Sequence, residues 1–61
     1  MLNIGDKVLI KRGVFLNHEG VIEHKFNYNN IDRYTVGIFK GKNITEKYVT
    51  TGVEGDFEKI K

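Results

Sequence analysis

The sequence predicts an all-β fold, and three observations support that prediction. Val, Ile, Thr, Tyr and Phe fill 24 of the 61 positions, and these residue types suit a pleated, half-buried surface. Strong helix formers are scarce, since the chain has no Ala or Gln and a single Met. Short segments with apolar residues at every second position are separated by glycines, which is typical of strands joined by turns.

The first predicted strand covers residues 7–12, because Val8 and Ile10 follow the period of two of a half-buried strand. Residues 13–20 begin and end with glycine and lack alternation, which indicates a long loop. Three consecutive apolar residues lie in this loop, and a core this small has no room for all of them. We therefore expect one or two to be exposed.

The second predicted strand covers residues 20–28. Its alternation puts these residues on one face: Ile22, His24, Phe26 and Tyr28. Residues 29–32 contain two Asn and one Asp, which tolerate positive φ and indicate a turn. The third strand, residues 33–40, directs Tyr34, Val36 and Ile38 to one side, and Gly37 indicates a bend or a close backbone approach.

The last two strands are predicted less sharply. Lys40-Gly41-Lys42-Asn43 fits a type II′ hairpin turn, because glycine occupies its first central position. A polar outer strand then covers residues 43–50, followed by a tight connection over residues 51–55. Residues 56–60 close the chain after one turn of tight helix, with Phe57 and Ile60 buried. We expect residues 1–61 to form one domain whose strands close into a barrel.

Composition excludes several classes of function. Without Cys the chain has no disulfide and no thiolate metal site, and this suits the reducing cytoplasm. The first residues read neither as a signal peptide nor as a membrane span. His18 and His24 lack the spacing of zinc ligands, so we expect no metal or other cofactor. Ser and Cys are both absent and no base is paired with a Thr or Lys, so we expect no enzyme.

The chain resembles a small SH3-like barrel, and its first half resembles a KOW motif. The matching segments are Gly5-Asp6-Lys7-Val8-Leu9-Ile10, Gly13 and Gly20-Val21-Ile22, and then Tyr34-Thr35-Val36, the Lys40-Gly41 turn and Asp56-Phe57-Glu58-Lys59-Ile60. The resemblance implies a five-stranded barrel that binds nucleic acids, peptides or modified side chains. The chain has no Trp and lacks the aromatic series that binds proline-rich peptides, so proline-rich recognition is not expected.

The first functional hypothesis is a non-enzymatic protein-binding module. Exposed apolar residues on a soluble protein commonly mark a protein contact, and the loop residues Val14, Phe15 and Leu16 are the candidates. Many Lys, Ile and Asn residues beside few Arg and no Ala suggest an AT-rich coding sequence, which favours a phage or prophage protein that inhibits a host defence or transcription protein. A second copy of the chain is another expected partner, which would make a homodimer.

The alternative hypothesis is a KOW-like barrel that binds RNA or DNA. Lysines and arginines would contact phosphates and exposed aromatic rings would stack on bases, with Phe15 near Arg12 as one such ring. The net charge of only +2 places this hypothesis second. The candidate residues are Lys11, Arg12, Lys25, Tyr28, Arg33, Lys40 and Lys42.

Overall fold

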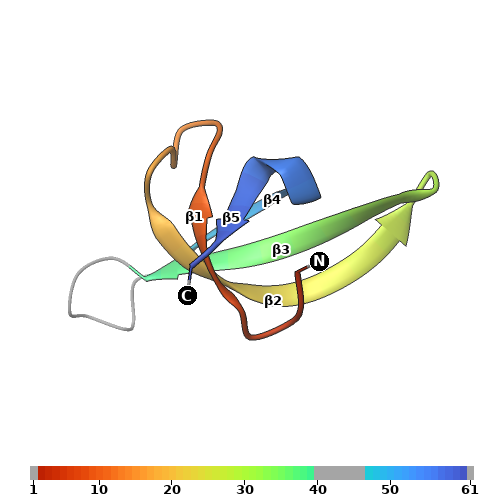
Figure 1. Cartoon of the computed structure of the whole chain (residues 1–61), viewed down its shortest axis with the longest axis horizontal. Helices are drawn as coiled ribbons and strands as arrows, with labels where there is room; N and C mark the ends of the chain where they lie inside the picture. The colour runs from red at the N-terminus through yellow and green to blue at the C-terminus, as the bar shows by residue number, and fades with distance from the viewer. Residues whose placement is uncertain (1, 40–46, 61) are drawn as a thin grey trace.

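The computed structural model describes residues 2–39 and 47–60, which form one antiparallel sheet of five strands (Figure 1). The elements are β1 (Lys7–Ile10), β2 (Glu19–Tyr28), β3 (Ile31–Phe39), β4 (Lys47–Val53), the 3-10 turn η1 (Glu54–Asp56) and β5 (Phe57–Lys59). In space the strands follow the order β4-β3-β2-β1-β5. The all-β prediction, with five strands and one turn of tight helix before the last, is therefore confirmed.

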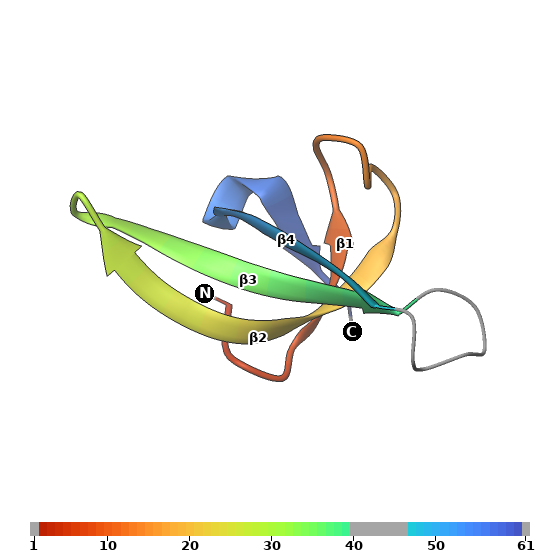
Figure 2. The same cartoon turned by 180° about the vertical axis from the view of Figure 1, so that it is seen from behind.

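The sheet is strongly curved, and β1 and β5 lie across the face of β2 and β3 in both views (Figures 1 and 2). It is not closed into the expected barrel. Within residues 2–39 and 47–60, β4 pairs with β3 alone and β5 pairs with β1 alone, so β4 and β5 remain the edges of the sheet. The three residues of β5 are all used against β1, and none pairs with β4.

The core forms between these crossing strands. The five residues expected to share one interior are each at most 3% exposed: Val8, Ile10, Ile22, Val36 and Ile38. Tyr34 and Phe57 are buried with them, and their rings meet edge to face with centroids 6.5 Å apart. Leu2, which no sequence pattern had indicated, is also buried. Burial of one such side chain stabilises the fold by roughly 1.5–3 kcal/mol.

The predicted faces of β2 are wrong beyond Ile22. Ile22 pairs with Val36, but the next pair is His24 with Thr35, so Glu23 is an extra residue on β2 and forms a β-bulge. One extra residue moves every following side chain to the opposite face. Ile22 therefore points into the core, whereas His24, Phe26 and Tyr28 lie on the outer face of the sheet and are exposed.

Several strand ends also differ from the prediction. Asn29 and Asn30 both have positive φ, 54° and 62°, which defines a two-residue type I′ turn, so β3 begins at Ile31 rather than at residue 33. β1 ends at Ile10, because a compact loop follows it. β4 runs on to Val53, since its pairing with β3 continues as far as Arg33. The predicted turn at residues 40–43 lies outside the described residues.

Two glycines permit a close approach between β2 and β3. A Cβ atom on Gly20 would lie 2.5 Å from Cγ1 of Val36 and 2.9 Å from the carbonyl oxygen of Gly37. A Cβ atom on Gly37 would in turn lie 2.5 Å from the carboxylate of Glu23. The close neighbour at Gly37 is thus the side chain of Glu23, whereas at Gly20 the close neighbours include the backbone of Gly37.

The hairpin of β2 and β3 extends well past the core. We call residues 24–33 the arm; its tip lies far from the other strands in Figure 1. Every residue from 24 to 32 is exposed. The arm contributes to the elongated shape of the molecule, whose longest dimension is 36 Å against 22 and 19 Å for the others. In the part of the chain that the structure describes, no helix is long and apolar enough to cross a membrane.

Candidate protein-binding surface

The first loop, residues 11–18, folds back tightly onto the end of β1. Its turns are permitted by positive φ at Gly13 (83°) and Asn17 (70°). The amide of Leu16 donates to the carbonyl oxygen of Gly13 over 3.2 Å, and the amide of Asn17 donates to that of Ile10 over 2.7 Å. Val14 and Phe15 are therefore the two central residues of a turn at the tip of the loop.

The three apolar residues of this loop separate into one anchor and two exposed side chains. Phe15 is half-buried against the core, with its ring centroid 5.9 Å from that of His18 and 5.7 Å from that of Tyr48. It is therefore not the exposed base-stacking ring that the nucleic-acid hypothesis required. Val14 is 90% exposed and Leu16 is 50% exposed. The loop thus presents nearly the whole of the Val14 side chain and about half of the Leu16 side chain to solvent.

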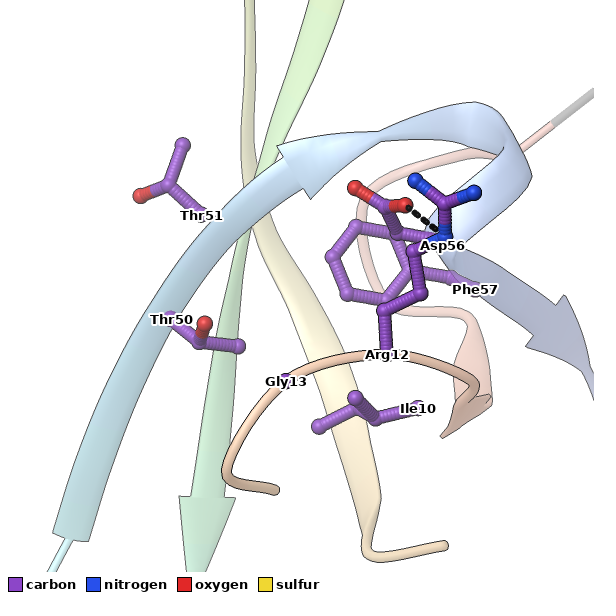
Figure 3. A pocket seen from close by; sticks show the side chains of 7 residues that line it. All are labelled: Ile10, Arg12, Gly13, Thr50, Thr51, Asp56 and Phe57. Carbon is purple, nitrogen blue, oxygen red and sulfur yellow. Dashed lines mark ion pairs between the residues drawn. The ribbon is translucent and has the colours of Figure 1, made fainter. Parts of the chain in front are cut away.

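A pocket of about 180 Å³ opens beside this loop (Figure 3). The first loop, β4 and η1 surround it, as Figure 3 shows. The buried side chains of Ile10 and Phe57 provide apolar walls, and the partly buried Thr50 lies on β4. The complete lining is Ile10, Arg12, Gly13, Thr50, Thr51, Asp56 and Phe57.

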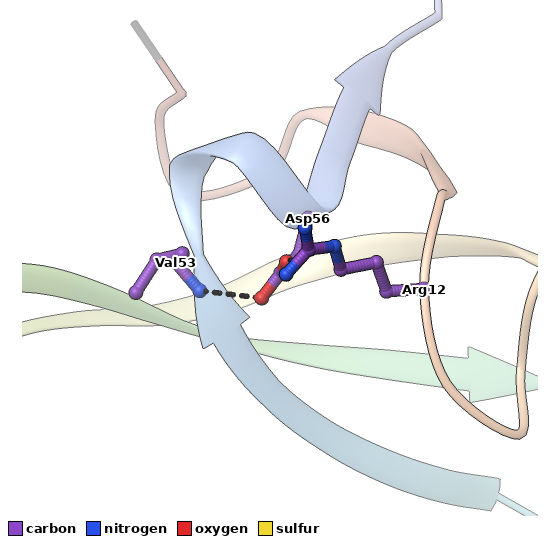
Figure 4. Close-up of polar contacts among 3 residues, drawn as sticks. All are labelled: Arg12, Val53 and Asp56. Carbon is purple, nitrogen blue, oxygen red and sulfur yellow. Dashed lines mark hydrogen bonds and ion pairs between the residues drawn. The ribbon is translucent and has the colours of Figure 1, made fainter.

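Two charged residues, Arg12 and Asp56, line this pocket (Figure 4). The Asp56 carboxylate accepts a hydrogen bond from the amide of Val53 over 3.1 Å, which fixes the start of η1. Its other oxygen lies 3.7 Å from Nε of Arg12. The Arg12 side chain is 80% exposed, so this pair contributes little to stability. Most of the guanidinium donors therefore remain accessible to a ligand.

Tyr34 lies behind the wall of the pocket and contacts Phe57, which lines it. Its ring packs against Phe57, and its hydroxyl donates to Oε1 of Glu54 over 3.1 Å. Burial is the main cause that raises the Tyr34 pKa above its ordinary value of 10.0, and the hydrogen bond and negative charge of Glu54 add to it. The hydroxyl is thus neutral at physiological pH and holds η1 against β3.

Those residues proposed for nucleic-acid binding that the structure describes lie on two separate parts of the fold. Lys11 and Arg12 lie in the first loop, whereas Lys25 and Arg33 lie on the arm. On the arm Lys25 and Arg33 occupy opposite faces. Lys25 pairs with the inward-facing Tyr34 and shares its face. Arg33 is the neighbour of Tyr34 on the same strand and therefore points to the other face. Lys40 and Lys42 lie outside the described residues.

Two cation-π contacts accompany these arm residues. The Arg33 guanidinium lies 5.7 Å from the centroid of Tyr28, and Nζ of Lys25 lies 5.8 Å from that of Tyr34. Tyr28 is 60% exposed, so an exposed aromatic ring beside a cation does occur on the arm. The buried Nε of Arg33 has no hydrogen-bond partner among residues 2–39 and 47–60.

No pattern in the sequence indicated the pocket itself. Its walls come from β1, the first loop, β4 and β5, which are distant along the chain. Thr50 ends the predicted polar strand and Asp56 begins the predicted closing strand, and neither residue type indicates a pocket by itself. What the sequence did provide was the apolar run at Val14 to Leu16, which lies beside the pocket.

The described residues thus define a small all-β protein with a curved five-stranded antiparallel sheet, an apolar loop and an adjoining small pocket. No protein-family model, no curated protein and no solved structure matches this chain.

Proposed function

We propose that this chain is a non-enzymatic protein-binding module that holds a short segment of a partner protein against the first loop and the adjoining pocket. The observation that carries the proposal is the exposure of Val14 and Leu16 next to Gly13, which lines the pocket. Exposed apolar side chains that adjoin a concavity are typical of recognition surfaces.

The pocket suits one apolar side chain of the partner. An apolar cavity of about 150 Å³ holds a benzene molecule, so a pocket of about 180 Å³ accommodates a side chain of the size of Leu or Phe. Arg12, exposed at the rim, favours a carboxylate nearby, because guanidinium groups bind carboxylates through paired hydrogen bonds. The preferred segment therefore carries an apolar residue next to Asp or Glu.

We also propose that the sheet is an open member of the SH3-like architecture. The support is the strand order β4-β3-β2-β1-β5, together with the 3-10 turn that returns the chain from β4 to a last strand beside β1. In this reading the pocket lies where the edge strands β4 and β5 come nearest to closing the sheet, since Thr50 and Phe57 both line it.

Selection of a random peptide display library on the immobilised chain tests the function. We expect enriched peptides with an apolar residue beside an acidic one. Their affinity should fall at least about tenfold in the double variant Val14→Ser, Leu16→Ser, and similarly in Arg12→Gln. The matched control is Val49→Ser, because Val49 is 53% exposed and lies on the outer face of β4. Failure to enrich any motif, or equal binding by all variants, contradicts the proposal.

Nucleic-acid binding is the second candidate function, and the contact that favours it is the Arg33 guanidinium on the exposed Tyr28 ring. Fluorescence anisotropy with single-stranded RNA and DNA oligonucleotides at low salt tests it. Binding that weakens steeply with salt and is lost in Tyr28→Ala and Arg33→Gln would support this candidate. No binding at micromolar protein would eliminate it.

A further inference from the structure

The outer part of β2 has one edge without a partner strand. β1 pairs with β2 only as far as Val21, and the backbone of Ile22 bonds to Gly5 and Asp6. From residue 24 to residue 28, β2 pairs with β3 alone within the described part of the chain. Figure 1 shows this free edge along the arm. An unpaired strand edge presents a row of hydrogen-bonding groups to any other strand.

The turn geometry determines which groups point outward. In a two-residue hairpin the residues flanking the turn, here Tyr28 and Ile31, form a hydrogen-bonded pair. Bonded and non-bonded pairs alternate from there, so Lys25 and Asn27 belong to non-bonded pairs. Their N–H and C=O groups therefore point away from β3, toward the open edge.

We propose that two copies of this chain associate by antiparallel pairing of these edges, with the two-fold axis at Phe26. In this register Lys25 of one copy faces Asn27 of the other, and each such pair exchanges two N–H···O bonds. The two Phe26 residues face each other as a non-bonded pair. The two sheets then join into one sheet of ten strands.

The side chains of the arm fit this register. Phe26 is 43% exposed and meets its own copy on the outer face, where aromatic pairs across antiparallel strands are stabilising. Tyr28, 60% exposed, faces His24 of the other copy. Lys25 faces the neutral Asn27, so no like charges are opposed. The outward hydrogen-bonding groups of the arm edge therefore pair with those of a second copy, and no like charges stand directly opposite each other.

Association with a second copy explains why the hairpin extends beyond the core, whereas folding of the single chain does not. The residues from 24 to 32 are all exposed and bury no side chain of their own. Residues that extend a hairpin beyond its core gain packing only when another surface covers them. The expected homodimer thus forms at the arm rather than at the loop containing Val14 and Leu16, which stays free for a partner.

The outward amide of Asn27 permits a matched test of this association. Asn27→Pro removes that amide and leaves the bonds between β2 and β3 intact, since proline is tolerated on an outward-facing edge position. Asn27→Ala keeps the amide but loses the same side-chain bond to Asp32, 3.0 Å long. By sedimentation equilibrium we expect dimers for wild type and Asn27→Ala, and a dissociation constant at least about tenfold higher for Asn27→Pro.

Disulfide trapping tests the register itself, because the chain has no Cys. Phe26→Cys places two thiols across a non-bonded pair, within the Cα distance that a disulfide requires. Mild oxidation should link these copies rapidly. Ile31→Cys, equally exposed but one strand further from the axis, should not link. A wild-type chain that stays monomeric at about millimolar concentration, or a dimer unaffected by Asn27→Pro, would overturn the proposal.

Discussion

Tyr34 combines more roles than any other residue of the described chain. Its ring fills the core and packs against Phe57, and its hydroxyl reaches Glu54 at the start of η1. A buried hydroxyl needs such a partner, because removal from water without one is unfavourable. The tyrosine therefore connects β3, the 3-10 turn and the wall of the pocket.

The raised pKa of Tyr34 predicts a loss of stability in alkali. Above pH 10 the unfolded chain ionises this tyrosine while the folded chain still holds the proton, so the free energy of unfolding falls as pH rises. Tyr34→Phe should be about 1 kcal/mol less stable near neutral pH, from the lost hydrogen bond. Urea titrations should show that this difference narrows above pH 10. A constant difference would contradict the assignment.

Single residues were predicted well where alternation was unbroken. Val8, Ile10, Val36 and Ile38 were expected inside and are buried. Leu2 was not expected, because it stands outside any periodic segment and its burial depends on the chain folding back onto Tyr34. Phe15 was expected to be exposed, but its partners His18 and Tyr48 cannot be inferred from spacing.

At the scale of elements, the β2–β3 hairpin depends on its turn. Both Asn29 and Asn30 adopt the left-handed conformation, which is unfavourable for residues with a Cβ atom and least so for Asn and Gly. Glycine is the residue that type I′ turns favour at the second position. The turn is thus adequate but not optimal.

Substitutions of Asn30 should therefore shift stability in opposite directions. Asn30→Gly should raise the melting temperature, because glycine adopts positive φ without strain. Asn30→Ala should lower the free energy of unfolding by about 1 kcal/mol. Thermal unfolding followed by circular dichroism measures both effects. Equal melting temperatures for the two variants would show that the turn does not limit stability.

The orientation of a whole element proved harder to predict than its existence. The sequence of β2 alternates without interruption from Ile22 to Tyr28, and nothing in it reveals that Glu23 is a bulge residue. The bulge follows from pairing with β3, where the carboxylate of Glu23 occupies the space beside Gly37. Such information lies in the partner strand, so a single strand read alone assigns the wrong face.

At the scale of the molecule, stability rests on few side chains. A core this small supplies roughly 3–5 kcal/mol, and Phe57 is a large part of it, packed between β1 and Tyr34 with 7% of its surface exposed. Deletion of a buried phenylalanine side chain removes about 3–5 kcal/mol. One substitution can therefore remove most of the stability of the fold.

Phe57→Ala should accordingly be largely unfolded at room temperature. Phe26→Ala should remain folded, because Phe26 lies on the arm and is exposed. Far-ultraviolet circular dichroism and urea titration distinguish the two. A cooperatively folded Phe57→Ala variant would show that the interior is not held together by the contact between β1 and β5.

The candidate site was predictable only in part, because one part of it is local in sequence and the other is formed by distant segments. The apolar run in the first loop is local in sequence and could be recognised. The pocket requires Ile10, Thr50 and Phe57 to converge from three strands, which depends on the curvature of the whole sheet. The basic residues form one set in the sequence, but the fold places the described ones apart, with Lys11 and Arg12 in the first loop and Lys25 and Arg33 on opposite faces of the arm.

The separation of the arm from the core has a consequence for how this protein can change. No strand residue from 24 to 28 is buried, so the interior does not constrain the identity of these residues, and substitutions at these strand positions should change the melting temperature of the domain little. Related proteins could have a longer or shorter hairpin, or different charges on it, and keep the same hydrophobic core. Association specificity and folding would then evolve independently.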